Sequence, residues 1–479
     1  MRLQPEPTTM IGHKHTKALT TVYALPFEVL STIFVFFCEE LFSDRDSTVW
    51  TRGLVKTPMV LGAVCHIWRS VAWTSPRLWA DIHLPIGRTA KNHAGLRASM
   101  EEWLQRSGTF PLRIHLNSRF RSQHPVSIQP LIALANGCAD RWKSLEIVSY
   151  HPSILTELLN NNSITNSSLE LLYVTLNYGS RYKDQDGREH FIFDMGAHSP
   201  RHVTCFGISP ASFNCRWHLL EKLSFAYGSG LTVDRFLRIL REAPRLAHCS
   251  VCVDFSDVRE GLAMALAHNR LEVLELSLIQ DFEEGGPSMT ACLEELLSYL
   301  TLPSLESLEI SYESSTCFDG QLQQVFNSFL SRSLCFLKKF KLDGLLFLEE
   351  DHEAQLVQTL LTMPLLEQLE IATNSEDTAE GLTNYFFMRL SVWDGDRNLV
   401  PHLKHFNYMG PCGFSLEKVA EISCGKSTPL EATGTNNAES VKTPRVMDQI
   451  TLDLTSKESD AEGSPPHGQP IRRTILLVA

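Results

Sequence analysis

A six-residue pattern recurs along most of the chain and limits its fold more than any other feature. Apolar residues occupy the first, fourth and sixth positions, with other residues between them. Ten segments carry the pattern: Trp142/Leu145/Ile147, Leu169/Leu172/Val174, Val203/Phe206/Ile208, Leu220/Leu223/Phe225, Leu246/Cys249/Val251, Leu271/Leu274/Leu276, Leu305/Leu308/Ile310, Leu337/Phe340/Leu342, Leu366/Leu369/Ile371 and Leu403/Phe406/Tyr408. Their first residues lie 17 to 37 positions apart, and most gaps hold a helical pattern. A single strand and helix cannot bury such an apolar row, so neighbouring units must stack.

This array resembles a degenerate leucine-rich repeat, and Asn177 and Asn374 occupy the asparagine position of the fuller repeat. The resemblance implies an α/β solenoid with a parallel sheet on its concave face. A further strand is expected at residues 110–116, where apolar and polar residues alternate. The shortest spacing leaves little room for a helix, so either the unit starting at Val203 or the one starting at Leu220 is misplaced.

Residues 21–84 have a different pattern, that of a small all-α module. Pro26 fits the first turn of a helix, where its missing N–H costs nothing. Two runs of apolar residues then follow with helical spacing, and Pro76 ends the second. They are Leu30, Ile33, Phe34 and Phe37, and then Leu61, Val64, Cys65, Trp68, Val71 and Ala72. So many large apolar side chains on about 60 residues suggest a surface for a partner.

Three pieces of this module resemble the F-box motif, and they are closest to the large fungal group of F-box proteins. In order they read Leu25-Pro26-x-Glu28-Val29-Leu30-x-x-Ile33-Phe34, Leu61-x-x-Val64-Cys65-x-x-Trp68-Arg69-x-x-Ala72 and Pro76-x-Leu78-Trp79. The stretch 43–57 between the first two is longer than a minimal F-box needs. The resemblance implies docking on the Skp-type adaptor of a cullin–RING ubiquitin ligase. The implied contact residues are Leu25, Pro26, Leu30, Ile33, Leu61, Val64, Cys65, Trp68, Leu78 and Trp79. Packing within the module is the other role open to each of them.

The residues between the apolar positions of the repeats form a second candidate surface, because side chains alternate along a strand. The central column reads Glu146, Tyr173, Gly207, Ser224, Ser250, Glu275, Glu309, Lys341, Glu370 and Asn407. Charge gathers in its later half. We therefore expect the protein substrate to bind at Glu275, Glu309, Lys341 and Glu370. The alternative is a solvated face without a ligand, since the wet side of a sheet normally carries charge.

Composition excludes several other functions. The chain has 55 acidic and 43 basic side chains, a formal net charge of -12, whereas a general nucleic-acid binder is normally basic. The most apolar run, residues 29–38, is too short to span a membrane. Twelve scattered cysteines indicate buried thiols in a reducing compartment.

Motifs for catalysis or for a bound cofactor are missing from the sequence, so we expect neither an enzyme nor a cofactor. There is no G-x-S-x-G, no H-E-x-x-H and no phosphate-binding glycine loop. Cys249-x-x-Cys252 has zinc-like spacing, but Cys249 takes a core position of its repeat and no second pair follows. We therefore expect no metal site there.

These features divide the chain into five parts: a flexible tail at 1–20, the F-box-like module at 21–84, a linking helix at 85–109, the solenoid at 110–424 and a mostly disordered tail at 425–479. Within the last part, residues 450–454 are a candidate edge strand. The expected function is that of a substrate-recognition subunit of a Skp–cullin–F-box ubiquitin ligase, in the cytoplasm or the nucleus. The alternative is a non-catalytic interaction scaffold that does not promote degradation.

Overall fold

A computed structural model describes residues 25–39, 58–86, 90–118, 128–159, 167–176, 193–195, 198–208, 213–226, 231–255, 265–279, 288–348, 350–373, 381–391, 399–423, 449–456 and 471–478. These residues form two compact units, one within 1–149 and 164–169 and the other within 150–163 and 170–479. Several expectations fall outside the described residues: those for the tail at 1–20, the stretch 43–57, Asn177, Asn374 and most of the tail at 425–479.

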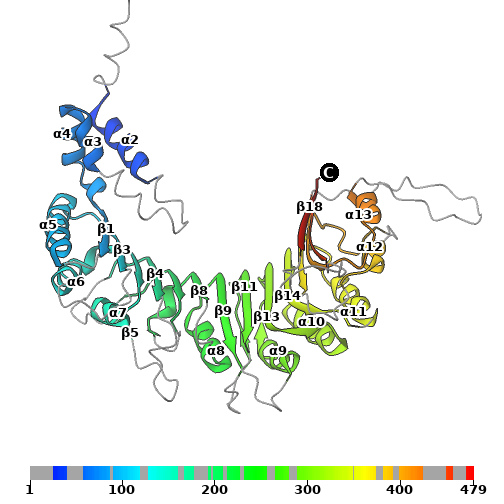
Figure 1. Ribbon diagram of the computed structural model, residues 1–479. Coiled ribbons are helices and arrows are strands. Elements are labelled where there is room, and N and C mark those ends of the chain that lie inside the picture. The colour runs from blue at the N-terminus through cyan, green and yellow to red at the C-terminus, as the bar shows by residue number, and fades with distance from the viewer. Residues whose placement is uncertain are drawn as a thin grey trace, which may run out of the picture. The chain divides into compact units, whose positions relative to one another are not determined.

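The first unit begins with short helices and continues into a parallel sheet (Figure 1). Its elements are α2 (Phe27–Glu39), α3 (Pro58–Val64), α4 (His66–Thr74), the 3-10 helix η3 (Pro76–Trp79), β1 (Asp81–Ile86), α5 (Ala90–Ser107), β2 (Leu112–Ser118), α6 (Gln129–Asn136), the 3-10 helix η5 (Ala139–Arg141) and β3 (Trp142–Ser149). Strands β1, β2 and β3 are neighbours in that order, and both pairings are parallel. The strand expected at 110–116 is β2.

The second unit holds a larger sheet whose strands follow one another in chain order. The strands of this sheet are β4 (Leu171–Leu176), β6 (His202–Phe206), β8 (Lys222–Ala226), β9 (His248–Asp254), β11 (Val273–Ile279), β13 (Ser307–Cys317), β14 (Lys339–Leu346), β15 (Gln368–Thr373), β16 (His405–Pro411), β17 (Gln449–Ser456) and β18 (Ile471–Val478). Every pairing from β4 to β17 is parallel, and only β18 runs antiparallel to its neighbour. The protein therefore has a mixed α/β fold with a large, mostly parallel sheet.

Helices connect these strands and lie along one side of the sheet (Figure 1). They are α7 (Pro152–Leu159), η8 (Trp217–Leu219), α8 (Val233–Glu242), α9 (Met289–Ser298), α10 (Gly320–Ser333), α11 (Glu350–Leu360), α12 (Asn384–Ser391) and α13 (Leu416–Ser423). Two short parallel pairs, β5 (Phe193–Asp194) with β7 (Phe213–Asn214) and β10 (Leu266–Ala267) with β12 (Leu300–Thr301), lie within the connections. Parallel strands need such crossovers, since no tight turn can join them.

The core is built from the apolar positions of the six-residue pattern. The fourth positions lie opposite one another from strand to strand and are all buried: Leu274, Leu308, Phe340, Leu369 and Phe406. Ile450 on β17 continues this row. The segment 450–454 therefore extends the parallel sheet, and β18 pairs on its far side. The burial of these positions confirms the strand registers predicted for the later repeats.

One of the two doubtful repeats is misplaced by three residues. Val203 lies opposite Leu172, which is a fourth position, so it is not the first residue of its unit. Cys205 takes the sixth position and is fully buried, whereas Phe206 is only half-buried. The prediction places Phe206 at the fourth position and omits Cys205, although a free cysteine also packs as a small apolar residue. The column residue of this strand is accordingly Thr204, and Gly207 lies outside the column.

Candidate functional site

Helices α2, α3 and α4 and the 3-10 helix η3 share a small apolar core. It contains Leu30, Phe34, Val35, Cys38, Leu61, Val71, Ala72, Leu78 and Trp79. Gly62 lets α3 approach α4 closely, since a Cβ atom there would lie 1.9 Å from the Trp73 ring. The Arg69 Nε donates to the Gly62 carbonyl at 2.8 Å and also joins the two helices. The module thus holds its own shape and presents its remaining apolar side chains on a fixed frame.

The ten residues that the F-box resemblance implies as adaptor contacts have different environments. Leu30, Leu61, Leu78 and Trp79 are buried, so they act by holding the core. Leu25, Pro26, Ile33 and Val64 are exposed. Cys65 and Trp68 are half-buried. Cys65 precedes α4 and its Sγ accepts from the Trp68 backbone N–H at 3.4 Å, so it caps that helix. The Trp68 ring packs 4.8 Å from the ring of Phe34.

Exposed apolar side chains cover much of the outside of this module. We call them the apolar face: Leu25, Phe27, Val29, Ile33, Phe36, Phe37, Met59, Val60 and Val64. Val29, Ile33 and Phe36 lie on one side of α2, because they are four and three residues apart. Phe36 is the most exposed of the set at 67%. Exposed apolar side chains gathered in this way are typical of a surface for another protein.

The later half of the predicted column forms a continuous row on the second unit. Glu275 lies opposite Glu309, Glu309 opposite Lys341, and Lys341 opposite Glu370. All four side chains are half-buried on the face of the sheet that points away from the core. The sequence pattern therefore correctly predicted that these four residues, from four separate repeats, are neighbours on the sheet.

A lysine that was not predicted from the sequence lies beside this row. The Lys339 Nζ is 2.8 Å from Glu309 Oε1 and 3.4 Å from Glu370 Oε1. Burial opposes its charged form, but the hydrogen bond to Glu309 and the neighbouring carboxylates outweigh this effect and raise the pKa of Lys339. Lys339 is two residues before Lys341 on the same strand, so strand alternation was the available signal. The row is therefore a mixed network of charges, with less net negative charge than the column alone indicated.

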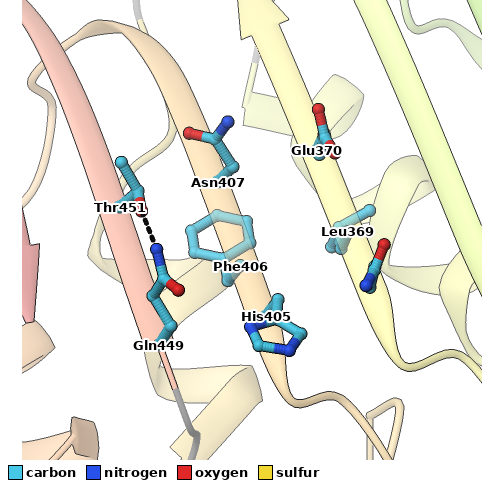
Figure 2. A pocket seen from close by; sticks show the side chains of 8 residues that line it. Leu369, Glu370, His405, Phe406, Asn407, Gln449 and Thr451 are labelled. Atoms are coloured by element: carbon cyan, nitrogen blue, oxygen red, sulfur yellow. Dashed lines mark hydrogen bonds between the residues drawn. The ribbon is translucent and has the colours of Figure 1, made fainter. Parts of the chain in front are cut away.

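A hollow of about 200 Å³ adjoins this row at the last parallel strands (Figure 2). Its polar lining comes from Gln368, Glu370, His405, Asn407, Gln449 and Thr451. Figure 2 shows these side chains standing on three neighbouring strands, with the Gln449 amide donating to the Thr451 hydroxyl at 3.1 Å. The repeat pattern does not predict this hollow, because one of its walls is β17, which lies in the segment 425–479 and was expected only as a candidate edge strand at 450–454.

A second polar cluster lies on the sheet of the first unit. His83 on β1 is opposite His115 on β2, and His115 is opposite Glu146 on β3. The two imidazole rings stack with 4.3 Å between centroids. Asp81 Oδ1 is 3.0 Å from His83 Nε2 and 2.9 Å from His115 Nε2. Only Glu146 was selected from the sequence. Asp81, His83 and His115 precede the first of the ten repeats, so no pattern aligned them with the column.

The electrostatics of this cluster favour the charged forms of His115 and Asp81. Burial disfavours a charged imidazole, yet the contacts with Asp81 and Glu146 outweigh it and raise the pKa of His115 to about 9. Burial likewise disfavours the charged Asp81 carboxylate, but hydrogen bonds from His115 and His83 hold its pKa well below the usual value. A proton on His115 thus stabilises two carboxylates that are mostly removed from water.

The cysteine pair weighed as a metal site is divided between the two faces of β9, because Cys249 and Cys252 are three residues apart on that strand. Burial raises the pKa of the Cys249 thiol well above its usual value and that of Cys252 to about 12. Among the described residues, the only group of His, Cys, Asp or Glu side chains close enough to share a metal ion is Asp81, His83 and His115.

A buried histidine of the second unit makes stability depend on pH. Burial lowers the pKa of His198 to about 4, against about 6.5 in an unfolded chain. The unfolded chain therefore takes up a proton first, so stability is full above pH 6.5 and falls as the pH drops towards 4. We expect a loss of about 2 kcal/mol between pH 7 and pH 5 from this residue.

Urea unfolding at the two pH values tests this expectation. The His198→Gln variant should lose about 2 kcal/mol less than the wild-type chain over the same interval. His218→Gln is the control, because His218 is exposed. An equal pH response in wild type and His198→Gln would contradict the assignment.

Comparison with known proteins finds no family model and no curated protein that matches this chain. Among the described helices, none combines the length and apolar character needed to cross a membrane.

Proposed function

We propose that this protein is a substrate-recognition subunit of a Skp–cullin–F-box ubiquitin ligase. The observation that carries the proposal is the helical module. Its residues follow the order of the F-box motif, its helices share a core, and a set of large apolar side chains stays exposed on α2 and α3. This combination is expected of a module that docks on a partner and gains stability from burying its outer face.

The exposed members of the implied contact set are the residues we assign to the adaptor interface. Leu25, Pro26, Ile33 and Val64 are accessible, and the other members of the apolar face are exposed on α2 and α3. A stable interface buries about 800 Å² on each partner, with a few central side chains supplying most of the affinity. Ile33 and Val64 are suited to that central role because each is apolar, exposed and carried by a helix.

We further propose that the second unit is a leucine-rich-repeat-like solenoid whose exposed sheet face holds the substrate. Support comes from the strand order, which follows the chain, and from the helices along the other side of the sheet. The mixed row of Glu275, Glu309, Lys341 and Glu370, with Lys339 among them, suits a partner that presents both charges. Paired charges of this kind fix orientation and select partners more than they add affinity.

The mechanism of such a subunit is proximity. One part binds the ligase through the adaptor, and the other binds a protein. Lysines of the captured protein then meet the charged ubiquitin carrier at a high effective concentration. The chain itself performs no chemical step, and its contribution lies in holding two partners at once.

Reconstitution with purified adaptor, cullin and RING subunits tests this function. The full chain should assemble with them and promote ubiquitin transfer to proteins captured from an extract. The Leu25→Ala/Pro26→Ala variant should capture the same proteins without transfer, because its link to the ligase is weakened. Assembly with the adaptor but no ubiquitin transfer would instead favour the alternative of a non-degradative scaffold.

The charged row gives a separate prediction. Reversing Glu275, Glu309 and Glu370 to lysine should abolish substrate capture, since five like charges would then lie together on the sheet. Adaptor binding should be unchanged. The matched control reverses Glu272, Glu306 and Glu367, which are three residues earlier in the same repeats. Capture that survives the first variant, or that fails equally in the control, would contradict a substrate site at this row.

A further inference from the structure

The cluster on β1 and β2 has the composition and spacing of a metal site. Asp81 Oδ1 is within 3.0 Å of the Nε2 atoms of both His83 and His115, and the three ligand atoms lie within 4.8 Å of one another. We propose that Asp81, His83 and His115 bind one divalent transition-metal ion, with zinc as the best fit. This site is independent of the proposed function and lies in the first unit.

The distances between the donors suit a small ion. Zinc binds histidine nitrogen at about 2.0–2.1 Å and carboxylate oxygen at about 2.0–2.2 Å. Tetrahedral geometry then places neighbouring donors about 3.3–3.4 Å apart. The observed separations from Asp81 Oδ1 are 2.9 and 3.0 Å, so small movements of the side chains open the space for the ion. Two imidazoles and one carboxylate favour zinc or another transition metal over magnesium or calcium, which prefer oxygen.

The backbone holds two of the three ligands in register. His83 and His115 are direct partners on adjacent parallel strands, so their side chains leave the same face of the sheet side by side. Asp81 precedes His83 by two residues and shares that face. Ligands on paired strands lose little freedom when the ion binds, which favours binding.

Glu146 supports the proposal from a third strand. Its Oε2 is 3.2 Å from His115 Nδ1, on the side of the ring away from Asp81. A proton on Nδ1 that is donated to Glu146 leaves the Nε2 lone pair directed at the ion. Histidines that bind metals commonly donate their other ring N–H to a carboxylate, which fixes the tautomer and strengthens the bond to the ion.

Solvent reaches the site. The side chains of Asp81 and His83 are 18% and 24% exposed, while that of His115 is 9% exposed. An ion held by three protein ligands keeps its fourth position for water or for a group from a partner. The open position lies on the exposed face of the sheet, where a carboxylate or histidine of a bound protein could take it.

Titration of the chelator-treated full chain with zinc chloride, followed by calorimetry, tests the proposal. We expect one ion per chain with a dissociation constant below about 1 µM. Cobalt should give the visible absorption of a tetrahedral site, and zinc should displace it. Magnesium chloride should give no saturable heat. Absence of saturable zinc binding by the wild-type chain would overturn the proposal, and the cluster would then be a protonated histidine between two carboxylates.

Variants identify the ligands. His83→Gln and His115→Gln should each weaken zinc binding at least about 100-fold, and Glu146→Gln should weaken it about 10- to 100-fold. His405→Gln is the control, since His405 is a half-buried histidine on β16 of the second unit. Far-ultraviolet circular dichroism verifies that each variant is folded. Zinc binding unchanged in a folded His83→Gln variant would also overturn the assignment.

Discussion

Replacing Trp79 by alanine should unfold the helical module, at a cost of about 3–5 kcal/mol. Trp79 is fully buried, and its ring meets the rings of Trp73 and Trp103 edge to face at 5.4 and 5.3 Å. Its indole N–H donates to the Ala72 carbonyl at 2.8 Å, and the Arg106 guanidinium lies 4.5 Å from its ring. Alanine removes the ring that joins η3 to α4 and α5.

Chemical denaturation followed by tryptophan fluorescence measures this loss. Trp79→Phe is the matched control, because it keeps an aromatic ring and loses the indole hydrogen bond, so about 1–2 kcal/mol is expected. Adaptor binding should fail in Trp79→Ala because the exposed contact residues lose their support, although Trp79 itself is fully buried. If the Trp79→Ala chain unfolded at the same denaturant concentration as the wild type, the module would not depend on this packing.

The second large effect is expected at the apolar face itself. Changing Ile33 and Val64 to glutamate should weaken adaptor binding at least about 100-fold, or about 3 kcal/mol, because a carboxylate must then lose water in an apolar contact. Both side chains are exposed, at 47% and 60%, so the fold should tolerate the change. The thermal midpoint of the double variant should stay near that of the wild type.

A matched control comes from the second unit. Phe336→Glu makes the same kind of change at an apolar side chain that is 65% exposed and far from the module in sequence. Its adaptor affinity should equal that of the wild type. Retained adaptor affinity in the Ile33→Glu/Val64→Glu chain would show that these positions on α2 and α3 do not contact the adaptor.

The repeated pattern predicted most strands of the sheet, because the buried positions of each strand need apolar side chains. Positions such as Leu308 and Leu369 are fully buried, so they need apolar side chains that fill the core. The pattern failed at Val203, which takes the fourth position and not the first, so the sixth position is Cys205 and not Ile208. The six-residue pattern did not include β17, although the apolar run at 450–454 marked it as a candidate edge strand, because Ile450 follows a long polar segment.

The candidate sites were harder to predict, because exposure and pairing depend on packing between distant segments. The F-box resemblance places Trp79 and Ile33 in one contact set, yet the first is buried and the second is 47% exposed. Lys339 was not predicted, because its contacts with Glu309 and Glu370 depend on the pairing of β14 with β13 and β15. In the same way, His83 and His115 become neighbours only through the pairing of β1 with β2.

The affinity of the purified full chain for a purified Skp-type adaptor tests the central claim most directly. Calorimetry should show a one-to-one complex with a dissociation constant below about 1 µM, and the Ile33→Glu/Val64→Glu chain should bind at least about 100-fold more weakly. No detectable heat of binding at about 50 µM adaptor, from a wild-type chain shown to be folded, would contradict the assignment of the helical module as an adaptor-docking element.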